Sequence, residues 1–145
     1  VLGKKFGTLS QIVYLALGLI GLPVFAQFQG GFGAVLRPTF GFLLGFILGA
    51  FLCALLYEKL PIKNNYLKAF LSALVGMIAI YALGISYFYF LINYFIGKDM
   101  SFFAIIIMMI PFMIPDGIKL TAAAFMGVIL RKRMQDHHLM DMEKE

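Results

Sequence analysis

Two charged side chains in a very apolar chain have the residue types and the spacing to bind a polar ligand. Asp116 and Lys119 lie three residues apart, directly after Pro115. A proline followed by an acidic residue is typical of the first turn of a helix, so we predict that a helix begins here. Residues at positions i and i+3 share one face of a helix, so the carboxylate and the ammonium group would project together.

This charged pair has two interpretations. It could be a local ion pair at the start of the helix, with Lys119 reaching back toward the membrane surface. It could also be a ligand site, because ionisable residues in an apolar span are costly and usually functional. A carboxylate accepts hydrogen bonds from N–H groups, and an ammonium group donates to C=O groups or carboxylates. The second interpretation therefore predicts a small ligand with both N–H and C=O groups.

The elements that must position this pair are membrane helices. Of the 145 residues, 62% are hydrophobic and 13% are charged. A soluble domain carries about 25% charged residues, so the composition predicts an all-α integral membrane protein. The apolar runs have helical length and lack the alternation of barrel strands. The single Cys53 and the adjacent His137 and His138 offer no metal cluster, so we expect neither a metal nor a cofactor.

The apolar runs predict a helical bundle of about four transmembrane helices in one domain, residues 1–133. The predicted spans cover residues 8–22, 39–57, 67–96 and 115–130, and residues 134–145 form a polar tail. Pro111 and Pro115 argue against an unbroken helix through residues 102–115, where we expect a short surface helix or a packed loop.

Glycines are expected to shape the first half of the bundle. Gly41, Gly45 and Gly49 recur every four residues, and small residues on one face allow two membrane helices to approach closely. The connection at residues 23–38 is rich in glycine and aromatic residues but remains apolar. We expect either a loop packed on the bundle or a lid over a cavity, and the two are compatible.

The basic residues predict how the chain is oriented. With a cytoplasmic C-terminus, nine of the twelve Lys and Arg residues fall on the inner side, and only Arg37, Lys98 and Lys119 fall on the outer side. This distribution is typical of topology determinants beside anionic lipid, and we do not expect nucleic acid as a partner. The same orientation brings Arg37, Asn93, Asp116 and Lys119 to the external side.

Three motifs together closely resemble the BioY family. They are GLIGLPVFA at residues 18–26 followed by a Gly-rich loop, RPTFGFLLGF at residues 37–46, and PFMIPDGIK at residues 111–119. They occur in the family's order and spacing, and the resemblance extends to about residue 133. The family has six helices, so the chain resembles its last four, with the first two absent from this sequence.

The resemblance implies a function. BioY proteins are the biotin-binding S components of energy-coupling factor (ECF) vitamin transporters, located in the plasma membrane of prokaryotes. It implies that biotin is the ligand, that its site faces outward, and that Asp116 and Lys119 contact its ureido group, with the valerate carboxylate as another acceptor for Lys119. It also implies a T component and paired ATPase subunits as partners, and a chain that is not itself an enzyme.

The resemblance also marks secondary candidates and departures. Arg37 and Thr39 are candidates because their motif would lie near the site. Arg37 and Pro115 each stand where the family often has glycine, and Tyr87 stands where it often has tryptophan. Tyr87 belongs to an aromatic segment, residues 87–95, that is expected either at the membrane interface or along an apolar pocket.

Three other functions remain as alternatives. The first is an S component for a different vitamin. The second is a small membrane enzyme that uses Asp116 as an acid or base, which would need a nucleophile or a metal cluster nearby. The third is a structural membrane subunit, which would leave the charges on the outer face unexplained.

Overall fold

The fold is a bundle of helices. The computed structural model of the chain describes residues 2–25 and 28–136. Its elements are α1 (Gly3–Ile20), the 3-10 helix η1 (Phe32–Leu36), α2 (Phe40–Lys59), α3 (Asn65–Phe90), the π-helix η2 (Leu91–Ile96) and α4 (Phe102–Asp136). Within the described residues no strand is formed beyond an isolated bridge between Phe25 and Gln29. The predicted all-α class is confirmed.

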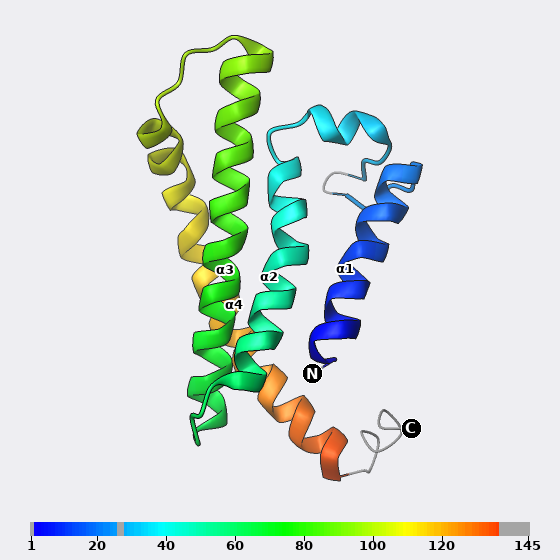
Figure 1. Ribbon diagram of the computed structural model, residues 1–145, viewed down its shortest axis with the longest axis vertical. Coiled ribbons are helices and arrows are strands. Elements are labelled where there is room, and N and C mark those ends of the chain that lie inside the picture. The colour runs from blue at the N-terminus through cyan, green and yellow to red at the C-terminus, as the bar shows by residue number, and fades with distance from the viewer. Residues whose placement is uncertain (1, 26–27, 137–145) are drawn as a thin grey trace.

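The helices alternate in direction along the bundle (Figure 1). Helix α2 packs against both α1 and α3, and α4 packs against α3. Helix α4 starts beside α3, crosses behind it and ends below α1 and α2. One end of the bundle therefore holds the start of α1, the α2–α3 connection and the end of α4, and we call it the basic end. The opposite end holds η1 and the α3–α4 connection, and we call it the loop end.

Local signals set the helix ends. The side chain of Asn64 accepts hydrogen bonds from the backbone N–H groups of Tyr66 and Leu67, which caps the start of α3. Helix α1 ends at Gly21 and the π-helix η2 ends at Gly97, both in left-handed conformations that glycine adopts readily. The turns at the loop end therefore follow from residues that can be recognised in the sequence.

Three helices in the described part of the chain are long and apolar enough to cross a membrane. They are Phe40–Lys59, Asn65–Ile96 (α3 with η2) and Phe102–Gln135. The first predicted span, residues 8–22, corresponds to α1, which has 18 residues and is not one of these three. The predicted spans at residues 39–57 and 67–96 agree with α2 and with α3 plus η2 to within two residues at each end.

The glycine stripe of α2 faces α3. A Cβ atom added at Gly45 would lie 2.8 Å from the Cα of Ile80, and one added at Gly49 would lie 2.9 Å from the carbonyl oxygen of Gly76. Gly76 in turn leaves room for the backbone of Gly49. The two backbones thus touch, as the four-residue glycine spacing predicts.

The predicted start of the last helix is wrong. Helix α4 is continuous from Phe102 to Asp136 and contains both Pro111 and Pro115. Each proline lacks an N–H group and removes one helix hydrogen bond, but an open segment would leave more polar groups unpaired in an apolar environment. Asp116 therefore lies about 21 Å along α4 rather than in its first turn.

Contacts at the basic end tie the helix termini together. The ammonium group of Lys4 lies 3.0 Å from the carboxylate of Glu58, which joins α1 to α2. The ring of Tyr57 contacts two cations, Lys68 of α3 and Arg131 of α4. Of the predicted polar tail, residues 134–136 continue α4, and residues 137–145, with His137 and His138, lie outside the described residues.

A single added methyl group should test the α2–α3 contact. We expect Gly45→Ala to lower the free energy of unfolding by about 1–3 kcal/mol, because the new Cβ would meet the backbone of Ile80. Gly127→Ala is the matched control, since a Cβ there has no neighbour within 4 Å. Thermal unfolding in detergent measures both variants, and equal stability of the two would contradict this packing.

Candidate functional site

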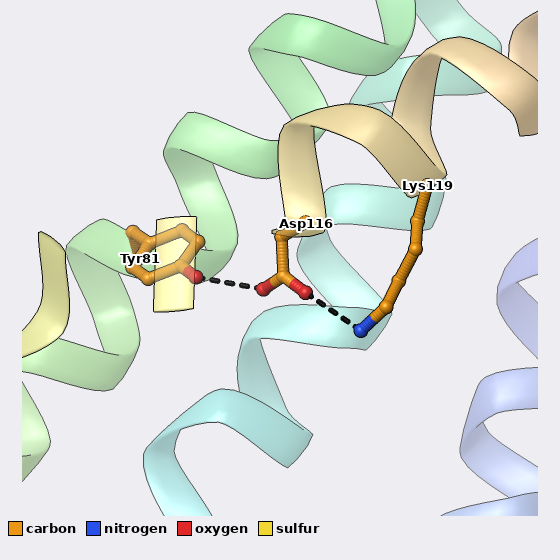
Figure 2. A network of polar contacts seen from close by, with 3 residues as sticks. All are labelled: Tyr81, Asp116 and Lys119. Carbon is orange, nitrogen blue, oxygen red and sulfur yellow. Dashed lines mark hydrogen bonds and ion pairs between the residues drawn. The ribbon is translucent and has the colours of Figure 1, made fainter. Parts of the chain in front are cut away.

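Asp116 accepts a hydrogen bond from each of two helices. The hydroxyl of Tyr81, on α3, donates to Oδ2 at 2.7 Å. The ammonium group of Lys119, one turn further along α4, donates to Oδ1 at 3.1 Å. Figure 2 shows the carboxylate between the two donors, with Tyr81 on one side and Lys119 on the other. The two oxygens of Asp116 therefore have different partners.

The two donors differ strongly in exposure. Tyr81 is only 7% exposed and belongs to the core cluster between α3 and α4. The side chain of Lys119 is 76% exposed, and that of Asp116 is 41% exposed. The site therefore has one fixed donor from the interior of the bundle and one donor that is free to move.

The local sequence of α4 explains how the pair is presented. Residues 116 and 119 lie on one face because the helix continues through both prolines. Pro115 has no N–H group, so the carbonyl of Pro111 has no helical donor four residues later. The charged pair thus follows two prolines, and residues 102–130 of α4 carry no other charge. Ionisable groups at such a depth are usually functional.

Tyr87 holds the glycine-rich connection against α3. Its hydroxyl donates a hydrogen bond to the carbonyl of Val35, in η1, and its ring packs at a tilt on Phe40 at the start of α2. Arg37 and Thr39 follow η1 and are both exposed. Thr39 occupies the N-cap position of α2, but its side chain makes no capping hydrogen bond.

Asn93 closes the α3–α4 connection. Its side-chain amide donates to the carbonyl of Met100 at 3.0 Å, and its side-chain oxygen accepts from the N–H group of Met100 at 2.7 Å. Both polar groups of Asn93 are thereby bound to one backbone residue. This reciprocal pair fixes the π-helix η2 relative to the turn that leads into α4.

The candidate residues fall into two groups. Asp116 and Lys119 are together, and within the described ranges no hydrogen bond or ion pair connects them to Arg37, Thr39, Tyr87 or Asn93. A cavity of about 640 Å³ lies toward the basic end, between all four helices. None of the candidate residues lines that cavity, so we place the candidate site at the charged pair on chemical grounds.

Tyr81 is the site residue that the sequence analysis missed. It precedes the aromatic segment of residues 87–95 and stands alone in the middle of a long apolar helix. A buried tyrosine hydroxyl usually finds a hydrogen-bond partner, so a lone tyrosine at mid-span is a usable signal. The partner could not be chosen from sequence while Asp116 was assigned to the start of a helix.

These features define a class of protein. A bundle of apolar helices with an anchored aspartate–lysine pair inside a span is typical of a multi-pass membrane protein with an intramembrane polar site. Residues 1–136 match the model of the BioY family. The chain belongs to the BioY family.

Individual relatives agree with this membership. The chain is 43% identical to the biotin transporter BioY of Thermotoga maritima over 132 residues, which are 91% of this chain and 73% of the relative. It is 34% identical to a probable biotin transporter BioY of Pyrococcus horikoshii, over 93% of this chain and 72% of the relative. The match with a crystal structure described as the S-component for biotin from an ECF-type ABC transporter has a TM-score of 0.81 and 30% identity, over 90% of this chain and 68% of that one.

The hydrogen bond from Tyr87 gives a prediction about the connection. We expect Tyr87→Phe to speed amide hydrogen exchange in residues 34–37 about fivefold, because a neutral hydrogen bond contributes about 1 kcal/mol. Tyr94→Phe is the matched control, since Tyr94 is 74% exposed, stacks on Phe90 and donates no hydrogen bond within residues 2–25 and 28–136. Unchanged exchange in Tyr87→Phe would show that this bond does not hold the connection.

Proposed function

We propose that this protein is the biotin-binding S component of an ECF-type vitamin uptake transporter. The family membership and the names of the relatives support biotin as the ligand. The observation that carries the proposal is the pair of Asp116 and Lys119, held by Tyr81 inside an apolar helix. Ionisable groups inside an apolar span are usually functional, and a carboxylate beside an ammonium group matches the polar groups of a ureido ring.

The chemistry of binding is an exchange of hydrogen bonds. Asp116 accepts from a ureido N–H group, and Lys119 donates to the ureido oxygen or to the valerate carboxylate. In the free protein these two side chains are bonded to each other at 3.1 Å, so the ligand replaces an ion pair rather than water alone. Charge-assisted hydrogen bonds on both groups make this replacement favourable when the ligand excludes water.

The other candidate residues act at the loop end. Arg37 is exposed and is the one cation in the sequence of the connection, residues 23–38, so it can contact the ligand carboxylate, with Thr39 two residues further on. Tyr87 and Asn93 are already bonded to Val35 and Met100, and they contribute by holding the two connections in place. This division separates residues that contact the ligand from residues that shape the entrance.

Transport needs partners. We propose that the chain docks on a T component driven by paired ATPase subunits, and that it binds the vitamin without chemical change. On this proposal the protein uses no cofactor, and the lipid bilayer surrounds it as a further partner. We further propose that the basic end faces the cytoplasm, because eight of the Lys and Arg residues in the described chain gather there. They are Lys4, Lys5, Lys59, Lys63, Lys68, Arg131, Lys132 and Arg133.

Neutralising the charged pair tests the ligand site. We expect Asp116→Asn and Lys119→Ala each to weaken biotin binding at least tenfold, or about 1.4 kcal/mol, because each removes a charged hydrogen-bond partner of the ligand. Equilibrium binding of labelled biotin to the full-length protein gives the affinities. Glu58→Gln and Lys4→Ala are the controls, since they remove the other exposed ion pair found among the described residues, at the basic end.

The outcomes separate the alternatives. Unchanged biotin affinity in both Asp116→Asn and Lys119→Ala would show that this pair has a structural role instead. Wild-type protein that binds biotin no better than micromolar, but binds another labelled vitamin tightly, would favour an S component for that vitamin.

The orientation has its own test. In a Cys53→Ala background, we expect Lys98→Cys to react with a membrane-impermeant maleimide on intact cells and Lys63→Cys to react only after lysis. The reason is that Lys98 lies in the connection at the loop end and Lys63 in the connection at the basic end. The opposite labelling pattern would reverse the proposed orientation.

A further inference from the structure

Tyr81 orients the carboxylate of Asp116 from the opposite helix. Its hydroxyl is 2.7 Å from Oδ2, and this hydrogen bond links the middle of α3 to the middle of α4. Its ring packs edge-on against Phe42 of α2, with centroids 5.8 Å apart, and lies against Ile85 and Ile105. Three helices therefore fix the position of one hydroxyl group.

The ring of Tyr81 has little freedom to move. Phe42, which packs on it, also occupies the space that a side chain at residue 84 would need, so the α2–α3 contact at this level is closed. Ile105, from α4, is completely buried against the same cluster. Lys119, by contrast, is largely exposed and carries the flexible donor. A ligand would therefore displace the exposed Lys119 more easily than the buried Tyr81.

We propose that Tyr81 is a positioning residue for ligand binding. It keeps Oδ2 engaged and leaves Oδ1 as the oxygen that exchanges Lys119 for a ligand N–H group. The site then recognises one edge of a cyclic ureide or amide by hydrogen bonds. On that edge an N–H donor lies beside a C=O acceptor. This inference rests on the proposed function, because it deepens the role of the same carboxylate.

The consequence of losing the hydroxyl follows from the geometry. The terminal torsion of an aspartate is broad, so without Tyr81 the carboxylate can rotate and present both oxygens to Lys119. An ammonium group bonded to both oxygens competes more strongly with the ligand. The loss of affinity therefore arises from the orientation of Asp116 in the free protein, and the ligand need not contact Tyr81 itself.

Removing one hydroxyl tests this role. We expect Tyr81→Phe to weaken biotin binding by the full-length protein about tenfold, while Tyr89→Phe leaves it within twofold. Tyr89 lies two turns further along α3, packs edge-on against Phe102 and donates no hydrogen bond among the described residues. Equal affinity of Tyr81→Phe and wild type would overturn the inference and leave the proposed function standing. Absence of biotin binding by the wild type would overturn both.

A double-mutant cycle separates positioning from packing. The affinities of wild type, Tyr81→Phe, Asp116→Ala and the double variant are measured with ligand concentrations raised until the weakest binder saturates. We expect Tyr81→Phe to change affinity less than twofold in the Asp116→Ala background, because no carboxylate remains to be oriented. The same tenfold loss in both backgrounds would show that Tyr81 acts through packing, and would overturn the inference.

Discussion

A polar group in an apolar environment must find its partner within the protein, and this constraint accounts for the main features of the fold. It keeps α4 helical through Pro111 and Pro115, because an interrupted helix would leave more N–H and C=O groups unpaired. It brings the hydroxyl of Tyr81 onto a carboxylate rather than leaving both groups alone. It also binds both polar groups of Asn93 to a single backbone residue at the turn before α4.

The polar contact depends in turn on close helix packing. The backbones of α2 and α3 touch along Gly45, Gly49 and Gly76, which fixes how α3 is rotated relative to α2. That rotation directs Tyr81 toward α4, where its hydroxyl reaches Asp116. The glycine stripe contains no polar side chain and lies in another part of the sequence, yet it sets the position of the donor on which the charged pair rests.

Much of this architecture could be predicted because it depends on local signals. Apolar length identified the helices, the glycine spacing identified the contact face of α2, and the residue types of Asp116 and Lys119 identified a pair on one face. The start of α4 could not be predicted from Pro115, because proline ends helices in water but is tolerated where unpaired backbone is more costly. Tyr81 could not be predicted either, because Asp116 can be recognised as its hydrogen-bond partner only when Asp116 is placed inside α4 rather than at the start of a helix.

The difference in exposure between the two donors suits a carboxylate that is held in one orientation but remains open to a ligand. If Tyr81 and Lys119 were equally buried, a ligand would have to break a desolvated ion pair, which is strongly unfavourable once a charge loses its partner. If both were exposed, the carboxylate would have no fixed direction, and binding would have to order it. Tyr81 is a buried neutral donor and Lys119 is an exposed charged donor. This combination avoids both the breaking of a desolvated ion pair and the ordering of a loose carboxylate. In the proposed binding step, the carboxylate keeps its bond to Tyr81, and only the exposed ammonium group is exchanged for the ligand.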